Sequence, residues 1–428
     1  MKEPLRLGIA GLGTVGTGVV KILQSHATQL AERTGRSLLI SAVSARTRHK
    51  DRGVDLSGYA WEDDPVAMAQ RDDVDVFVEL MGGSDGPAKA ATEAALSAGK
   101  DVVTANKAML AIHGQALAEL AEKEARVLRF EAGVAGGIPC VKVLTEGLAG
   151  NATTRVMGVM NGTCNYVLTR MEGAGLPYAE VFREAGELGY LEADPTLDVG
   201  GIDAGHKLAL LASIAFGTRV DFDGVKLEGI ERISIDDIRH AADMGFRIKL
   251  LGVAQMNDAG LEQRMTPCLV PAQSPFGQLQ GATNMVVFEG DAVGQIVLRG
   301  AGAGQGPTAS AVMSDICDIA RGIRVNTFGQ PAASMRAANA VASGAPAPYY
   351  LRMTLRDQPG ALAEIAKVLG EVGISIDRMR QYGHQGDEAP VLIVTHSCDR
   401  SALDTAISGF AATGVMVGAP VALRIETV

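Results

Sequence analysis

The chain has 428 residues, of which 47% are hydrophobic and 21% are charged, and its formal net charge at pH 7 is -10. This composition is typical of a folded globular protein, and the length allows two or three domains with separate cores. The acidic balance, without a run of Lys and Arg, argues against a nucleic-acid or membrane-surface partner. We therefore expect a small-molecule substrate.

The cysteines and the first residues indicate a compartment. The five cysteines are scattered and form no CxxC pair, which favours reduced thiols over a disulfide framework. The sequence begins without a secretory signal and contains no apolar stretch of about 18 residues that would span a bilayer. We therefore expect a cytoplasmic protein.

A short apolar strand over residues 5–10 precedes a glycine-rich turn and an amphipathic helix. The turn has the spacing G-x-G-x-x-G, in which small residues let the backbone approach a pyrophosphate at a helix N-terminus. The same glycines could serve only a tight turn, but the strand-to-helix setting favours a dinucleotide site. Its candidate cofactor-binding residues are Gly11, Leu12, Gly13, Thr14, Val15 and Gly16.

The end of the next strand, over residues 37–45, bears on which cofactor fits. An NAD site usually places Asp or Glu there for the ribose 2′-hydroxyl, whereas this chain continues with Arg46, Arg48 and Lys50. This favours NADP, with NAD still possible, and Arg46 is the first candidate for the 2′-phosphate because it comes soonest after the strand. The alternative is that these cations form only a solvated loop.

Strands and helices continue to alternate up to about residue 137. The pattern predicts strands over 74–83, 100–107 and 126–137, with helices over 86–99 and 108–125. Such alternation is typical of a doubly wound parallel sheet, which binds ligands beyond the carboxyl ends of its strands. By position alone, the candidates at these ends are Gly82, Gly83, Asn106, Lys107 and Glu131.

A later helix combines an apolar surface with two charges. From Ile202 onward nearly every residue is apolar, so this helix should be buried on most sides. Asp203 and Lys207 are four residues apart and share one face, where a surface ion pair contributes only about 0.2–0.5 kcal/mol. Because a buried charge is costly unless it is paired, the two residues indicate a functional pair rather than a surface one.

Seven blocks, in order over residues 1 to about 330, carry a family resemblance. They read GLGTVGTGV, VELMGG, VVTANKAML, FEAGVAGGIP, MNGTCNYVLTRM, GYLEADPTLDVGGIDAGHKLALL and GAGAGQGPTASAV. With these blocks the chain resembles homoserine dehydrogenases. The resemblance implies an NAD(P)-dependent interconversion of L-homoserine and L-aspartate 4-semialdehyde, on the route to threonine, methionine and isoleucine. We expect reduction of the semialdehyde with NADPH.

This chemistry needs a hydride, a proton for the developing alkoxide, and groups that hold the substrate. A lysine with its usual pKa of about 10.4 is protonated at neutral pH, so we expect Lys207 to donate the proton. By resemblance, Lys107 lies near the nicotinamide and fixes the cofactor or shares in proton transfer. The resemblance also implies that Glu192 and Asp203 contact the substrate, with Asp194 and Asp198 as nearby alternatives.

Three further glycines have a cofactor role by resemblance or position. Gly189 looks like a family cofactor contact, although it could equally be a helix C-cap. A second glycine turn at residues 300–306 suggests that the chain returns to cover the cofactor, with Gly302 or Gly304 near the nicotinamide. A plain interdomain hinge is the alternative for this turn.

The block FEAGVAGGIP resembles the family's loop for sodium or another monovalent cation. The resemblance implies oxygen ligands, mainly backbone carbonyls, from Glu131, Val134, Gly136 and Ile138. A glycine-rich crossover between domains is the alternative. No Cys/His cluster has zinc spacing, which disfavours a zinc alcohol dehydrogenase, and His206 is expected to be a packed or capping residue.

The last part of the chain forms a separate module after a linker rich in Ala, Pro and Ser. Its predicted order is βαββαβ, and the stretch DQPGALAEIAKVLGEVGISI resembles an ACT domain. Such modules bind small amino acids at a domain interface, here near the turn Asp357–Gly360. Threonine is the expected effector as end product, and a role only in building a homodimer or homotetramer is the alternative.

Together these features predict a chain of mixed α/β and α+β class. We expect a Rossmann-like NAD(P)-binding domain at 1–133, completed by about 305–330, and an α+β substrate-binding and dimerisation domain at 134–304. A linker at 331–348 and an ACT domain at 349–428 follow.

Two other functions compete with this one. An aspartate-semialdehyde dehydrogenase needs an activated cysteine, and Cys164 has no evident base beside it in sequence. A non-catalytic amino-acid sensor would not need Glu192, Asp203 and Lys207 together.

Overall fold

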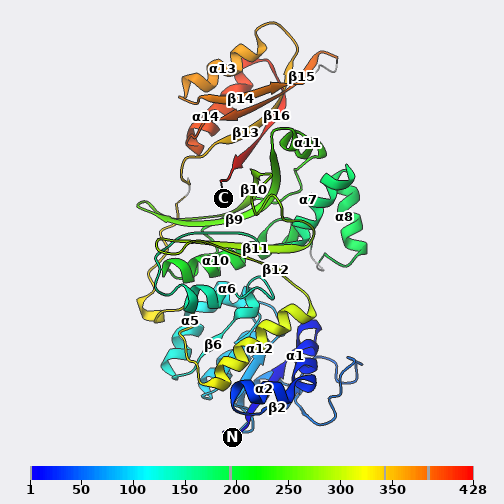
Figure 1. The fold of residues 1–428 in the computed structure, drawn as a ribbon, viewed down its shortest axis with the longest axis vertical. Helices are drawn as coiled ribbons and strands as arrows, with labels where there is room; N and C mark the ends of the chain where they lie inside the picture. The colour runs from blue at the N-terminus through cyan, green and yellow to red at the C-terminus, as the bar shows by residue number, and fades with distance from the viewer. Residues whose placement is uncertain (1, 192–194, 342–343, 383–385, 428) are drawn as a thin grey trace.

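The structure is a computed structural model that describes residues 2–191, 195–341, 344–382 and 386–427. Three parts follow one another along the long axis of the molecule (Figure 1). The N-terminal domain lies at one end, a mixed sheet occupies the middle, and the C-terminal module lies at the other end.

The N-terminal domain is built on a six-stranded parallel sheet with the order β3-β2-β1-β4-β5-β6. The order reverses between β1 and β4, and dinucleotides bind at such a point. The strands are β1 (Leu5–Ala10), β2 (Leu38–Ser44), β3 (Ala60–Trp61), β4 (Val76–Glu79), β5 (Asp101–Thr104) and β6 (Leu128–Arg129). The helices are α1 (Thr14–Ser25), α2 (Ala27–Thr34), α3 (Pro65–Gln70), α4 (Pro87–Ser97) and α5 (Lys107–Lys123).

This topology confirms the predicted fold class, and burial explains why these segments become strands. Every residue of β4 and β5 is buried, as expected for parallel strands covered by helices on both faces. The strand predicted over 126–137 ends earlier, at Arg129. The next segment forms a 3₁₀ turn over Glu131–Gly133 because the amide of Glu131 donates to Asp315 instead of to a neighbouring strand.

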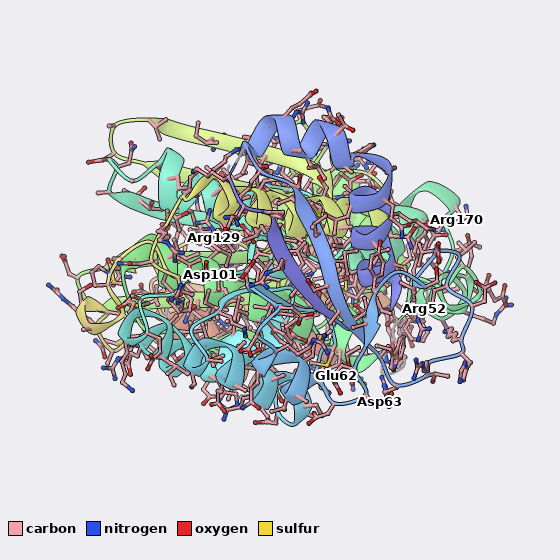
Figure 2. All side chains as sticks on the ribbon, turned by 90° about the horizontal axis from the view of Figure 1, so that it is seen from below. Arg52, Glu62, Asp63, Asp101, Arg129 and Arg170 are labelled. Atoms are coloured by element: carbon pink, nitrogen blue, oxygen red, sulfur yellow. The ribbon has the colours of Figure 1, made fainter. Side chains whose placement is uncertain are left out.

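Helix α12 (Gln305–Arg321) comes after the middle sheet in sequence but packs in the core of the first domain. It lies so close to α1 that a Cβ at Gly18 would approach Ala309 to 2.9 Å. Arg129 of β6 donates to Asp318 on this helix at 2.6 Å, and Figure 2 labels its side chain on the side of the sheet where α12 lies.

The middle of the molecule is a sheet with helices packed on it. Its strands are β7 (Thr153–Val159), β8 (Val225–Leu227), β9 (Phe246–Asn257), β10 (Gly260–Pro271), β11 (Thr283–Gly290) and β12 (Gly294–Ala301). The accompanying helices are α6 (Cys140–Lys142), α7 (Gly162–Ala174), α8 (Tyr178–Glu187), α9 (Thr196–Val199), α10 (Ile202–Phe216) and α11 (Ile235–Asp243). The apolar helix α10 packs on β7, β9 and β10. Among the described residues no helix is long and apolar enough to cross a membrane.

The C-terminal module has the predicted βαββαβ order. Its elements are β13 (Tyr349–Arg356), α13 (Ala361–Glu371), β14 (Ile376–Gln381), β15 (Glu388–Thr395), α14 (Arg400–Phe410) and β16 (Met416–Ile425). Strand β16 pairs with β13 and, through Arg424 and Ile425, also runs parallel to β10. The middle sheet and the module therefore form one continuous sheet with the order β12-β11-β7-β9-β10-β16-β13-β15-β14.

A buried carboxylate fixes this junction. Glu426, 2% exposed, forms ion pairs with Arg155 of β7, Arg264 of β10 and Arg424 of β16. Its backbone amide also donates to the carbonyl of Leu269 at 2.8 Å. Burial alone would raise the pKa of Glu426, but the three guanidinium groups outweigh it and hold the pKa below its ordinary value.

The substitution Glu426→Gln should destabilise the protein by about 3 kcal/mol, because it leaves three arginines around a neutral group. Denaturant unfolding at pH 7 measures this loss. Since the pKa is lower in the folded state, the stabilisation is complete above the unfolded value of 4.5 and is lost as the pH falls. The variant should therefore lose less stability than the parent on acidification. Glu371→Gln, at an exposed position, is the control, and equal stabilities of the two variants would contradict the role of Glu426.

Candidate active site

A cavity of about 580 Å³ lies between the N-terminal domain and the middle sheet. It brings together residues that are far apart in the sequence but were predicted to act together. Those on its walls are Val15, Lys107, Gly136, Gly189, Asp203, Lys207, Gly302 and Gly304, with Asp198 beside them.

Asp203 lies in the first turn of α10 and is 8% exposed. Its two carboxylate oxygens take different lysines: Oδ2 accepts from Lys207 Nζ at 2.7 Å, and Oδ1 lies 2.8 Å from Lys107 Nζ. Lys207 Nζ also donates to the backbone carbonyl of Met160 at 2.9 Å. One carboxylate therefore holds two ammonium groups at the wall of the cavity.

The electrostatics of this group follow from its contacts. Burial alone would raise the pKa of Asp203, but the ammonium groups of Lys207 and Lys107 outweigh that cost and hold the pKa well below its ordinary value. The two lysines therefore favour the ionised form of Asp203. Burial lowers the pKa of the neighbouring His206, whose ring packs on Phe222 with centroids 4.2 Å apart.

The carboxyl ends of β4 and β5 determine where Lys107 lies. Glu79, at the end of β4, accepts from the amide of Met81 at 2.7 Å and from the Thr104 hydroxyl at 2.5 Å. Asn106 then caps α5 by accepting from the amide of Met109, and its side-chain amide donates to the carbonyl of Gly83. Lys107, the first residue of α5, is thereby directed from a rigid strand end toward Asp203.

The glycine turn has the shape that a pyrophosphate site requires. A Cβ at Gly11 would lie 2.3 Å from the carbonyl oxygen of Leu80, and one at Gly16 would lie 1.9 Å from that of Gly11. A Cβ at Gly13 would meet no described atom within 4 Å, so the backbone is open there, at the N-cap of α1. Thr14 is exposed beside it, whereas the side chain of Leu12 is buried and only its backbone faces the turn.

Arg46 is exposed directly after β2, as the predicted phosphate contact would be. The loop that carries it is organised by Arg52, which sequence reasoning missed. Arg52 donates to the carbonyl of Leu12 in the glycine turn at 3.2 Å and to those of Thr47 and Lys50 in its own loop. The basic loop is therefore tied to the glycine turn, a contact between residues forty apart that no local pattern indicates.

Two asparagines at the cavity were also missed. Asn161 caps α7 and donates to the buried carboxylate of Asp198 at 2.9 Å. Asn284 is 1% exposed, packs against Gly302, and has no hydrogen-bond partner for its Oδ1 among the described atoms. Asn161 lies in the quoted block MNGTCNYVLTRM, whereas Asn284 lies in no quoted block. Glu192 and Asp194, two candidates for substrate binding, lie outside the described residues.

The loop proposed for a cation is buried and compact. Glu131, Val134 and Ile138 are each at most 2% exposed. The carboxylate of Glu131 accepts from the amides of Val141 and Lys142, and its backbone carbonyl accepts from the amide of Val134 at 3.3 Å. Burial, reinforced by the charge of Asp315, raises the pKa of Glu131 to about 7.

The cysteine chemistry of the competing dehydrogenase is not favoured by the geometry. Cys164 is fully buried, its thiol donates to the carbonyl of Asp198 at 3.3 Å, and burial raises its pKa well above the ordinary value. An activated nucleophile needs a lowered pKa. Among the described residues, no group of three or more His, Cys, Asp or Glu side chains could hold a metal ion.

Comparisons with known proteins agree with this geometry. A family model for homoserine dehydrogenase matches residues 139–317, and one for the homoserine dehydrogenase NAD-binding domain matches residues 11–131. A third, for the ACT domain, matches residues 349–408. A homoserine dehydrogenase of Neisseria gonorrhoeae is 40% identical over 433 residues, covering 99% of both chains.

The chain belongs to the homoserine dehydrogenase family. It is an NAD(P)-dependent oxidoreductase, as the sequence predicted. The homoserine dehydrogenase of Mycobacterium tuberculosis strain H37Rv is 39% identical, over 99% of this chain and 98% of its own. A crystal structure of a homoserine dehydrogenase from Thiobacillus denitrificans has a TM-score of 0.93 at 36% identity, covering 99% of this chain and 98% of its own.

Asn284→Leu should lower kcat/KM roughly fivefold, because it removes a buried hydrogen-bond acceptor from the cavity without changing side-chain volume much. Steady-state kinetics measure the loss, and thermal unfolding shows whether the fold is intact. Asn284→Asp keeps an oxygen at this place and should lose less. Equal kcat/KM for Asn284→Leu and the parent would exclude a role for Asn284 in this family's reaction.

Proposed function

We propose that the chain reduces L-aspartate 4-semialdehyde to L-homoserine with NADPH, and that Lys207 donates the proton. The observation that carries the proposal is the pair of lysines on Asp203, at the wall of the cavity that Val15 and the second glycine turn also line. The nicotinamide cofactor, when bound, supplies the hydride to the carbonyl carbon. The domain boundaries expected from the sequence stay predictions.

The proton step follows from the contacts of Lys207. An ammonium group has three donors, and Asp203 and the carbonyl of Met160 take two of them. The third is left for the substrate oxygen, which receives its proton as the carbonyl bond becomes an alkoxide. Lys107 holds the other oxygen of Asp203 and thereby fixes the direction in which Lys207 points. After the reaction, solvent returns a proton to Lys207.

The other carboxylates suit the amino-acid end of the substrate. An α-ammonium group is recognised by anions, and Asp198 lies at the cavity. Asp203 has this role only from the family resemblance, because both of its oxygens already pair with lysines. We keep Glu192 in this role from the family resemblance.

The preference for NADPH rests on the basic loop. Arg46 is exposed at the end of β2, and Arg52 ties its loop to the glycine turn. A hyperthermophilic archaeal homoserine dehydrogenase mutant, 26% identical with a TM-score of 0.63 over 76% of this chain, has been solved in complex with NADPH. These features support NADP over NAD as the cofactor.

We also propose that the loop from Glu131 to Ile138 holds sodium or another monovalent cation. The donors would be the backbone carbonyls of Glu131, Val134, Gly136 and Ile138, hard oxygen ligands that suit such an ion. Its place next to the cavity, where Gly136 contacts Gly302, suits a structural ion that fixes the cofactor side of the site.

Lys207→Met should lower the turnover number for semialdehyde reduction by at least about a hundredfold, because the proton donor is lost. NADPH and NADH oxidation measured side by side also tests the cofactor preference. Lys367→Met, at an exposed position of α13, is the control. Unchanged turnover in Lys207→Met would refute the assignment, and absence of activity in the parent chain would favour the amino-acid sensor instead.

We further propose that threonine inhibits semialdehyde reduction by binding to the C-terminal module. Deleting the module is a poor test, because β16 pairs with β10 and Glu426 neutralises Arg155 and Arg264. Titrating the full chain with threonine during semialdehyde reduction should instead lower the rate in a saturable way. A rate that stays constant up to millimolar threonine would contradict this expectation. The homo-oligomeric assembly expected from the sequence stays a prediction.

A further inference from the structure

One polar side chain at the catalytic cavity, which Asp203 and Lys207 line, has a hydrogen-bonding group that the fold leaves unused. Asn284 lies near the start of β11, is 1% exposed and lines the cavity. Among the described residues on the cavity wall, it alone has a buried side-chain atom, Oδ1, without a hydrogen-bond partner. Because an unsatisfied buried acceptor is costly, its place at a ligand cavity indicates a donor that arrives with the ligand.

Asn284 lies between the proton donor and the second glycine turn. The pairing of β11 with β7 begins one residue after Asn284 on β11 and ends one residue before Met160 on β7. The carbonyl of Met160 accepts from Lys207 Nζ at 2.9 Å. On the other side, a Cβ on Gly302 would overlap the side-chain amide of Asn284. The amide therefore lies next to both parts of the wall.

The glycine turn that Asn284 contacts belongs to the cofactor side of the cavity. Gly302 comes shortly before α12, which packs on α1. Val15, in the first turn of α1, and Thr308, in the first turn of α12, line the same cavity. A dinucleotide whose pyrophosphate binds at the start of α1 therefore has its nicotinamide end on the side of Gly302 and Lys207.

The chemistry of the asparagine determines which group it can recognise there. A nicotinamide ring has one polar substituent, a carboxamide, whose amino group is a neutral donor. A neutral amide oxygen suits that donor, whereas the α-ammonium group of an amino acid is matched by anions such as Asp198. The described residues thus fit a nicotinamide, with a free acceptor beside a glycine that leaves room for the ring.

We propose that Asn284 positions the nicotinamide by accepting a hydrogen bond from the amino group of its carboxamide. Asn284 thereby orients the ring at the end of the cavity where Lys207 lies. The proposal rests on the nicotinamide cofactor of the family and not on the identity of the substrate or on the role of Lys207. It makes Asn284 a determinant of cofactor recognition, and the contact forms before any substrate binds.

Isothermal titration calorimetry of the full chain with NADP⁺ and with its 3-acetylpyridine analogue, without substrate, tests the proposal. The analogue keeps the carbonyl oxygen but carries a methyl group in place of the amino group, so it cannot donate to Asn284. The parent should bind it about tenfold more weakly than NADP⁺. Asn284→Leu should bind both with equal affinity, and Asn284→Asp, which keeps an acceptor, should still prefer NADP⁺. The same measurements with NAD⁺ and its analogue make the test independent of the proposed NADP preference.

Gln295→Leu is the matched control, because it removes an amide from an exposed position of β12, the strand paired with β11, and it should keep the affinity ratio of the parent. Thermal unfolding shows whether each variant is folded. Equal affinities of the parent for a dinucleotide and its analogue would overturn the proposal without any variant. A tenfold preference that persists in Asn284→Leu would overturn it too, and so would failure of the parent to bind any of the four dinucleotides.

Semialdehyde reduction is measured separately from these titrations. A parent chain that binds the dinucleotides with the expected ratio but does not reduce the semialdehyde would refute the proposed function and support the role of Asn284.

Discussion

A buried carboxylate between two ammonium groups is the interaction on which the catalytic cavity depends. Asp203 could not remain ionised inside α10 without Lys207 and Lys107, since burial of an unpaired charge costs several kcal/mol. Lys207 comes from the same helix, but Lys107 comes from α5 of the other domain. The pairing therefore holds the two domains in register and leaves one net positive charge at the wall, where a carbonyl oxygen becomes negative during reduction.

Buried ion clusters also join the other parts of the chain. Arg129 and Asp318 attach α12 to the N-terminal sheet, although this helix follows the middle sheet in sequence. Glu426 and Arg264 attach the C-terminal module to β10. In each cluster the partners come from segments far apart, so removal of one segment takes away part of the charge that balances the other. The three parts are consequently more dependent on one another than a series of independent domains would be.

The sequence could predict what local patterns encode. Alternating apolar segments give the parallel sheet, and the spacing of Asp203 and Lys207 gives their shared helix face. The contact of Lys107 with Asp203 has no local signature and depends on how two domains pack. The same holds for Arg52, which reaches the glycine turn from a loop, and for Asn284, which reaches the cavity from an ordinary strand. The pairing of β10 with β16 could not be predicted from the sequence either, because parallel strands so distant along the chain are brought together only by tertiary packing.

Strand β10 links the C-terminal module to the helix that carries Asp203 and Lys207. One edge of β10 carries both β8 and β16, while α10, which bears Asp203 and Lys207, packs on its face. At the start of that helix the backbone comes so close to the strand that a Cβ at Gly201 would lie 3.2 Å from the side chain of Met265. Because such interiors are close-packed, β10 cannot move relative to the module without displacing the helix or opening a void. The position of β10 therefore fixes that of α10 and, with it, the positions of Asp203 and Lys207.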